Sequence, residues 1–286
     1  MLNREIYPVN FGLKEGASAV YQVEQQISYR VDDYQYDNEI ITVIKVTVDK
    51  STATSNQFSV QMLKQWQLKN DGSDAADLSM AQLRKNLLVE TDKEGNFSDV
   101  ANLPEIKNEW LKMRPEIAKK YADNEQHKEL INEAIVLLYT DGGLNSALQS
   151  SYLYHAIFPG LLQQTFSRDT NYTIDHYREI RNAIGATAIP FKTKVSLTDY
   201  NEEQNFCTIK IDGEIDRESF DQDAVSELFR ELLDIYNLDA FVEGFHLESF
   251  EFGNEGLPVQ SSQLTQYAIE GVLTYRHSCI LTPLNN

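Results

Sequence analysis

Three groups of residues in this sequence have the types needed for chemistry: an acidic hairpin, five histidines and a strand with alternating carboxylates. The acidic hairpin lies within residues 91–110, TDKEGNFSDVANLPEIKNEW. A calcium-binding EF-hand loop needs oxygen ligands at positions 1, 3 and 5, glycine at position 6 and glutamate at position 12. Counted from Asp92, the glycine comes at position 4, as Gly95, and position 12 is Leu103. The sequence therefore predicts a turn with Gly95 at positive φ, and not a calcium site.

The histidines lack the spacing of a metal or catalytic motif. None belongs to an HExxH motif, and GxSxG, GxxxxGK[ST] and GxGxxG motifs are missing from the sequence. His277 and Cys279 share one strand face, where residues two apart can bind one metal ion, but no second ligand pair accompanies them. We therefore predict no catalytic residue, no metal ligand and no cofactor. The five histidines are His127, His155, His176, His246 and His277.

The third group is the strand CTIKIDGEIDRE, residues 207–218, which carries its charges on one face. Successive strand residues point to opposite faces, so its acids form a solvated face opposite the isoleucines. Gly213 falls among the apolar positions without interrupting the alternation, which favours a bulge or a close packing contact. The candidate partner-binding residues on the charged face are Asp212, Glu214 and Asp216.

The charge balance limits the possible partners. The chain has 25 basic and 44 acidic residues, a net charge of −19, which argues against nucleic acid and against an anionic membrane surface. Residues 199–255 hold 17 acidic and three basic residues, a net charge of −14. A basic protein partner is therefore one alternative, with residues 199–255 as its docking surface.

The composition and the N-terminal sequence are compatible with more than one cellular compartment. Hydrophobic residues make up 42% of the chain, as in globular proteins, but no window approaches the roughly 18 to 20 apolar residues of a membrane span. The start, MLNREIYPVNFGLKEG, lacks the basic residues and apolar run of a secretory leader. We expect a cytoplasmic protein if this start is native, and a periplasmic or envelope protein if a leader was removed. Cys207 and Cys279 are expected to be buried free thiols, with a disulfide between neighbouring strands as the alternative.

Hydrophobic periodicity predicts an α+β fold with two antiparallel β-sheets around a central helical block. The apolar and polar residues alternate in strands and recur at helical spacing in the middle of the chain. Strands are expected at residues 19–31, 40–48, 58–68, 165–177, 188–200, 205–216, 244–253 and 267–281, and helices at 73–87, within 104–156 and at 216–238. We divide the chain into an N-terminal sheet lobe (1–103), a helical middle (104–160) and a C-terminal sheet lobe with one helix (161–286), in one continuous two-lobed body.

Aromatic residues suggest a cavity. The chain has 15 tyrosines, 13 phenylalanines and two tryptophans, and a curved sheet lined with aromatic and Met side chains beside helices can enclose apolar space. In the strand at 58–68 the candidate ligand-binding residues are Phe58, Met62 and Trp66.

Four segments together resemble an uncharacterised family of bacterial β-rich envelope proteins. They are FGLKEGASAVYQVEQQISY, LVETDKEGNFSDVANLPEIKNEW, the helix end YHAIFPG and the late FEFGNEGLPV. The order of strands and helices is also similar to the half-barrel of lipoprotein-carrier domains, which hold acyl chains in a concave sheet. The resemblance implies an envelope location and brings no catalytic residues.

These observations leave three hypotheses of different classes. The first is a non-enzymatic binding protein that holds a lipid-like, apolar ligand or a protein partner on a curved sheet. The second is an acidic immunity or adaptor protein that docks a basic partner through residues 199–255. The third is a hydrolase whose carboxylates pair across strands.

Overall fold

The computed structural model describes residues 6–9, 12–69, 82–120, 125–167, 170–234, 240–253 and 255–284. The strands in its first part are β1 (Ile6–Val9), β2 (Ser18–Val31), β3 (Tyr34–Ser51), β4 (Ser55–Lys69), β5 (Asn86–Asp92) and β6 (Phe97–Val100), with a 3-10 turn, η1 (Gln82–Arg84). The helical middle holds α2 (Leu103–Lys120), α3 (Glu125–Tyr139), α4 (Gly143–Gln149) and α5 (Tyr152–Ile157). The last part comprises β7 (Gln164–Ser167), β8 (Thr173–Ile184), β9 (Thr187–Asn201), β10 (Phe206–Ile215), α6 (Gln222–Leu233), β11 (Val242–Phe252), β12 (Pro258–Ile269) and β13 (Leu273–Pro283).

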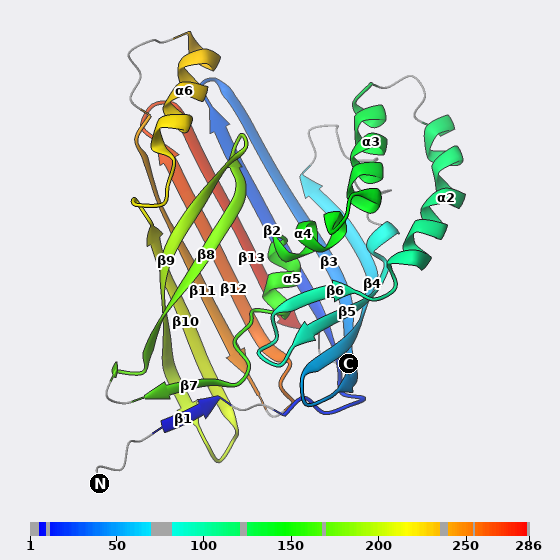
Figure 1. Ribbon diagram of the computed structural model, residues 1–286, viewed down its shortest axis with the longest axis vertical. Helices are drawn as coiled ribbons and strands as arrows, with labels where there is room; N and C mark the ends of the chain where they lie inside the picture. Colours follow the sequence, from blue (N-terminus) through cyan, green and yellow to red (C-terminus); the bar gives the residue numbers. More distant parts are fainter. Residues whose placement is uncertain are drawn as a thin grey trace.

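Eleven strands form one open antiparallel sheet in the order β6-β5-β4-β3-β2-β13-β12-β11-β10-β9-β8, and β1 pairs with β7 in a small second sheet. Figure 1 shows the large sheet as a half-barrel, with α2–α5 on one side of it and α6 at one end. We call the face toward α5 the inner face. The edges of the sheet, β6 and β8, do not pair with each other in the described part of the chain.

The predicted α+β class, with antiparallel strands and a central helical block, is confirmed. The long strands of the two halves belong to one sheet where we expected two. The pairing of β2 with β13, from Val31 opposite Leu273 to Tyr21 opposite Pro283, joins the halves. Such pairing satisfies backbone groups that two separate sheets would have left unpaired at their edges.

Several segments depart from the predicted elements. Residues 165–177, expected as a single strand, contribute to β7 in the small sheet and to β8 in the large one. The helix expected at residues 216–238 begins later, at Gln222 of α6. Residues 267–281, expected as a single strand, turn after Ile269, so they contribute to both β12 and β13. The helix expected at residues 73–87 lies largely outside the described residues, and its described part holds η1 and the start of β5.

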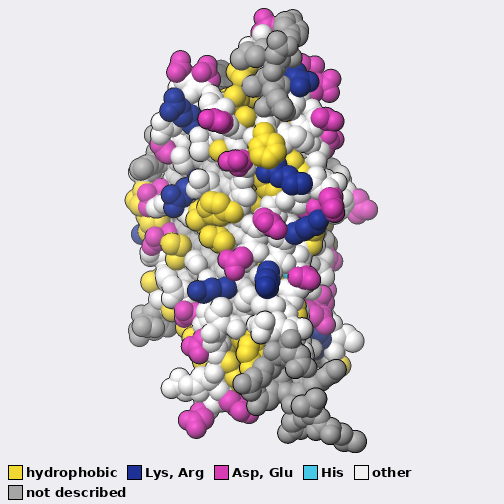
Figure 2. All heavy atoms as spheres, turned by 90° about the vertical axis from the view of Figure 1, so that its left-hand side faces the viewer, with side chains coloured by type: hydrophobic (Ala, Val, Ile, Leu, Met, Phe, Trp, Pro, Cys, Tyr) yellow, Lys and Arg dark blue, Asp and Glu magenta, His cyan; other side chains and the backbone are white. Residues whose placement is uncertain are grey.

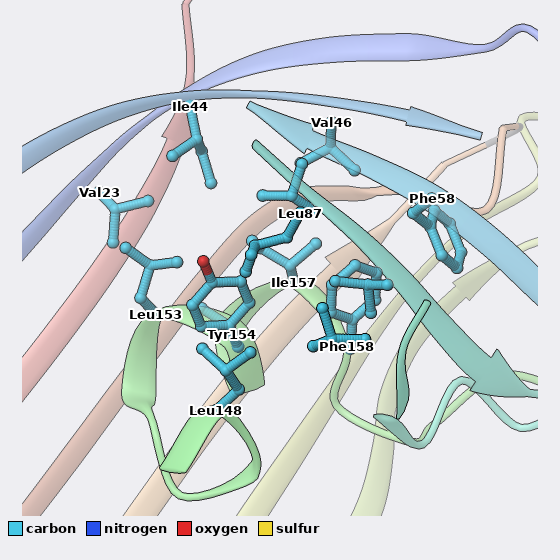
Figure 3. Packing of buried hydrophobic residues seen from close by; sticks show 14 of the residues in the cluster. Val23, Ile44, Val46, Phe58, Leu87, Leu148, Leu153, Tyr154, Ile157 and Phe158 are labelled. Carbon is cyan, nitrogen blue, oxygen red and sulfur yellow. The ribbon is translucent and has the colours of Figure 1, made fainter. Parts of the chain in front are cut away.

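The helical block fills the inner face of the first half of the sheet. Residues from α4 and α5 interdigitate with β2–β5, and α5 also contacts β12 and β13. Figure 3 shows Phe158, just after α5, beside Phe58 of β4; their ring centroids are 4.8 Å apart. Each aromatic ring buried in this way removes a large apolar area from water, which stabilises the packing of helix on sheet.

Local signals in the sequence fix the elements beside this core. Gly95 has φ +85° in the turn between β5 and β6, which confirms the predicted hairpin, and Asp92 accepts a hydrogen bond from the Asn96 N–H at 2.7 Å. At the start of α6, the Asp221 side chain accepts from the Ala224 N–H at 3.0 Å, which satisfies a donor that the helix leaves unpaired.

Replacing Phe58 with alanine tests the packing of the helical block. Phe58 is 1% exposed, so F58A should lower the free energy of unfolding by roughly 3 to 5 kcal/mol through lost burial and the cavity it leaves. The matched control is F245A, on the outer face of β11, where Phe245 is 36% exposed and the loss should be far smaller. Urea denaturation measures both values, and equal losses would contradict the assigned role of Phe58.

Candidate functional site

A row of polar residues crosses the inner face of the second half of the sheet. Adjacent strands β8 to β13 place these residues opposite one another in register. The row consists of His176, Thr193, Gly213, His246, Thr265 and His277. Three of the five histidines that looked scattered in the sequence therefore lie in one row, and His155 of α5 joins them from above the sheet.

Gly213 provides the space for this row. A Cβ atom at position 213 would lie 2.9 Å from Cγ2 of Thr193 and 3.2 Å from the carbonyl oxygen of His246. Any larger residue would push β9 or β11 aside, since Cβ atoms do not approach neighbours so closely. The close packing contact predicted for Gly213 is confirmed.

Glu248 of β11 is the centre of the site, and its side chain is 0% exposed. Arg178 of β8 donates to both of its oxygens, from Nε to Oε1 at 3.1 Å and from Nη2 to Oε2 at 3.3 Å. The Nε2 atoms of His155 and His246 lie 3.1 and 2.6 Å from Oε1. A buried carboxylate needs such partners, and Glu248 has three of them from α5, β8 and β11.

These partners set the ionisation of the site. Burial alone would raise the pKa of Glu248, but the charge of Arg178 and the hydrogen bonds of His155 and His246 hold the pKa well below its usual range. Burial lowers the pKa of His155 more than Glu248 raises it. At neutral pH the site therefore holds a carboxylate, a guanidinium and a neutral His155 ring.

A chain of hydrogen bonds leads from α5 to Glu248. The Tyr152 hydroxyl donates to Oγ1 of Thr265, and Oγ1 lies 2.7 Å from Nδ1 of His246. Because Nε2 of His246 donates to the ionised Glu248, its Nδ1 is the acceptor, and Thr265 donates to it. Each hydrogen bond in this series is therefore donated toward Glu248, and this order fixes the tautomer of His246.

The order of hydroxyl, imidazole and carboxylate in Thr265, His246 and Glu248 is that of a nucleophilic triad. Thr265 is 0% exposed, however, and its oxygen already accepts from Tyr152. A substrate has no access to this oxygen. The hydrogen bonds among these three residues therefore hold their side chains in position, and Thr265 does not act as a nucleophile.

Two cavities lie in the gap between β8 and the segment α4–α5, and Glu248 is in the wall of the larger one. The larger has a volume of about 420 Å³ and is lined by residues of α5, β8, β11 and β12 that include Tyr152, Tyr177 and Ile180. The smaller, about 240 Å³, has Phe97, Leu148 and Phe158 in its wall. Both are lined by Gln149, His155 and Arg178. We call the two cavities together the β8–α5 slot.

Side-chain bridges, and not strand pairing, hold the edge strand β8 against the helices. Arg178 donates from Nη2 to the carbonyl oxygen of Pro159 at 3.1 Å, just beyond α5. Arg181 donates from Nη1 to Oγ of Ser146 in α4 at 2.9 Å. The slot lies along this bridged gap, where the barrel is not closed by backbone hydrogen bonds.

Known proteins offer a comparison for this architecture. No protein-family model matches the chain, and no curated protein matches its sequence. A structure of lipovitellin, described by the words lipid–protein interactions, is similar with a TM-score of 0.50 and 10% sequence identity. The match covers 96% of this chain and 26% of the lipovitellin chain, so this chain spans about a quarter of that protein's length.

The likeness shows the fold alone. An open half-barrel of this kind agrees, at the level of architecture, with the resemblance to lipoprotein-carrier domains. A second structure, DynF from the dynemicin biosynthesis pathway of Micromonospora chersina, is 5% identical, with a TM-score of 0.22 over 100% of this chain and 88% of that chain. That similarity is too low to carry an argument.

The structure does not bring the three predicted ligand-binding residues together. Phe58 is packed in the core and Met62 is partly buried against the same cluster. A β-bulge between Met62 and Trp66 shifts the register of β4 against β3. After the bulge, Gln65 and Gln67 point to the inner face, where they donate to Thr42 and Asn38 of β3. Trp66 lies opposite Ile41 on the outer face. None of the three lines the β8–α5 slot.

The predicted partner-binding acids also separate. Asp212 and Glu214 are exposed on the outer face, opposite Lys194 and Lys192 of β9. Asp216 is buried instead, where it lies 2.9 Å from Nζ of Lys192 and accepts from Ser219 at 2.8 Å. Figure 2 shows lysine and arginine side chains set between acidic and hydrophobic ones on the face seen from the β9–β10 side.

The sequence did contain a signal for the site. In β11, VEGFHLESFEF, the buried Phe250 and Phe252 share their parity with His246 and Glu248, which places a charged residue among inward positions. The same alternation in β8 places Arg178 in one parity with Ile180. A charged residue at an inward position of an otherwise apolar strand face is therefore the sequence signal of this site.

Other chemistry expected or excluded from the sequence has these outcomes. Cys207 and Cys279 are buried free thiols, as predicted, and β11 and β12 separate their strands. No helix in the described ranges combines the length and apolar character needed to cross a membrane. Within the same ranges, no three His, Cys, Asp or Glu residues are grouped to hold a metal ion. The buried carboxylates found there, Asp216 and Glu248, each have a cation as partner and not another carboxylate.

Neutralising Glu248 should destabilise the fold strongly. E248Q leaves the Arg178 guanidinium, 14% exposed, without its counter-charge, so the free energy of unfolding should fall by roughly 3 to 5 kcal/mol. The double variant R178Q/E248Q should lose less than the sum of the single losses, with a coupling of roughly 1 to 3 kcal/mol. Urea denaturation of wild type, R178Q, E248Q and R178Q/E248Q gives this double-mutant cycle.

The control E179Q removes a carboxylate from an exposed pair with Arg181, and it should lower the free energy of unfolding by less than about 1 kcal/mol. Additive losses would mean that the buried pair is not coupled.

The inner histidines should make the protein less stable in acid. Burial lowers the pKa of His277 from 6.5 to about 4. Between these values the unfolded chain binds a proton that the folded chain does not, so stability falls as the pH drops from 6.5 to 4. A shift of this size corresponds to roughly 3 kcal/mol. In H277Q the difference in unfolding free energy between pH 7 and pH 4 should shrink by about that amount, and an unchanged difference would show that His277 does not titrate this way.

Proposed function

We propose that this protein binds an amphipathic, lipid-like molecule in the β8–α5 slot. The observation that carries the proposal is the slot itself. Its larger cavity of about 420 Å³ falls in the range of small-molecule sites, roughly 300 to 1,000 Å³. It lies on the inner face of the half-barrel, between an edge strand and the helical block.

The lining of the slot suits an amphipathic ligand. Aromatic and aliphatic side chains line part of both cavities, among them Tyr177, Ile180 and Leu148. Polar side chains line the larger cavity as well, among them Ser151, Glu179 and Arg181, and His155 and Arg178 lie where the two cavities meet. A molecule with an apolar body and one polar end fits this distribution, because few placed polar groups then fix its orientation.

The geometry of the gap supports exchange of such a ligand. The edge strand β8 is held to the helices by Arg178 and Arg181 through side chains, and not by a backbone ladder to β6. Side-chain bridges can open without breaking the sheet. The similarity in fold to lipovitellin, whose structure is described by its lipid–protein interactions, supports the same class of ligand.

A blocked slot tests the proposal. Gln149 lines both cavities and is exposed, so Q149W should fill the shared part of the slot and weaken binding of the apolar dye Nile red at least about tenfold. The matched control Q260W places the same side chain on β12 at an exposed position outside the slot. Fluorescence titration gives both affinities, and native mass spectrometry of protein purified from its own host identifies any ligand retained.

Two results would contradict the proposal. If wild type binds no dye and carries no small molecule, the slot is not a binding site. If Q149W binds the dye as tightly as Q260W does, the ligand lies elsewhere.

A further inference from the structure

The polar end of the slot also indicates the ligand's headgroup, an inference that rests on the proposed function. In the wall of the larger cavity, Glu248 is already saturated, since its two oxygens accept from Arg178, His155 and His246. It offers no acceptor to a ligand. Gln149, His155 and Arg178 line both cavities, and Arg178 and His155 are the two of them that can carry a positive charge.

Arg178 has N–H donors that its contacts with the described part of the protein do not use. Its contacts within the described residues use Nε and Nη2, for Glu248 and the carbonyl oxygen of Pro159, and leave the two N–H groups of Nη1. The side chain is 14% exposed and lines both cavities. A guanidinium edge of this kind binds the oxygen of a carboxylate or phosphate better than a neutral acceptor.

His155 stands on the other side of the same wall. Its ring is 20% exposed and lines both cavities, and its contacts within the described part of the chain go from Nε2 to Glu248. Nδ1 therefore remains for a ligand. Neutral His155 offers a lone pair there, and protonated His155 offers a second N–H donor.

The charges of the lining decide between anionic headgroups. Arg178 balances Glu248, and Arg181 lies 3.2 Å from Glu179. An added anion needs one further positive charge, and protonation of His155 supplies one. The single negative charge of a carboxylate equals the one positive charge that protonated His155 adds. A phosphate carries roughly −1.5 to −2 at neutral pH, which is more than this positive charge can neutralise.

We propose that the β8–α5 slot binds a long-chain carboxylic acid, with its carboxylate between Nη1 of Arg178 and Nδ1 of His155 and its alkyl chain along the apolar lining. One proton enters the site with each bound carboxylate. The charged and titratable groups that face His155 are Glu248 and His246 of β11 and Arg178 and His176 of β8.

The direction of the pH dependence follows from this proton. Burial lowers the pKa of His155 below 6.5 in the free protein, and a bound carboxylate raises it again. Between the two pKa values the complex holds a proton that the free protein lacks. The affinity for a carboxylate therefore rises as the pH falls through the pKa of His155 in the complex.

Three ligands with the same alkyl chain test the headgroup: decanoate, 1-decanol and decyl phosphate. Isothermal titration calorimetry at pH 7 should show decanoate binding roughly tenfold to a hundredfold more tightly than either of the others. Repeating the decanoate titration in buffers of different ionisation enthalpy should show uptake of one proton. H155Q should remove most of this uptake, and R178Q/E248Q should remove most of the preference for decanoate over decanol. R276Q, at an exposed arginine of β13, should change neither.

The outcomes separate the two proposals. If none of the three ligands binds, the proposed function fails. If all three bind with similar affinity, or if decyl phosphate binds most tightly, the carboxylate inference fails and the lipid-binding function stands. If H155Q takes up the same proton as the wild type, His155 is not its acceptor, and the assignment is overturned. The comparison of ligands on wild-type protein decides the headgroup even if a variant fails to fold.

Discussion

A carboxylate without solvent must be surrounded by donors, and Glu248 imposes this requirement on three separate elements. Arg178 comes from the edge strand, His155 from α5 and His246 from the same strand as Glu248. Meeting the requirement places β8 over the inner face of β11 and brings the end of α5 down to the same point. The unclosed side of the half-barrel therefore has a defined width, and the slot lies within it.

The helical block divides the interior into two parts with different chemistry. Over β2–β5 its side chains are apolar and the packing is complete, as Figure 3 shows for Phe58 and Phe158. Over β12 the sheet meets the backbone of α5, and polar side chains make the contact. Gln263 donates to the carbonyl oxygen of Tyr152, and Ser261 donates to that of Ala156. Space for a ligand remains where the apolar packing stops.

This division explains how much of the molecule could be predicted from the sequence. The strands with apolar inner faces and the helix α6 follow from periodicity. Strand β12 does not, because its inward residues include Ser261, Gln263 and Thr265, whose partners are polar groups on α5 and β11. The site around Glu248 was not predicted from the sequence for a related reason. Its residues come from α5, β8 and β11, and their proximity depends on the strand order, which local patterns do not encode.

The place of β2 beside β13 also has a consequence for how the chain folds. Both edges of the finished sheet, β6 and β8, come from the middle of the sequence, while β2 and β13 meet at its centre. During synthesis β2–β6 emerge before β13, and the backbone groups on the free side of β2 stay unpaired until β13 has been made. Such long-range pairing slows folding, and the exposed strand is open to association with other chains. The outward side of β2 carries Gln22, Glu24 and Gln26, polar side chains that discourage such contacts until β13 arrives.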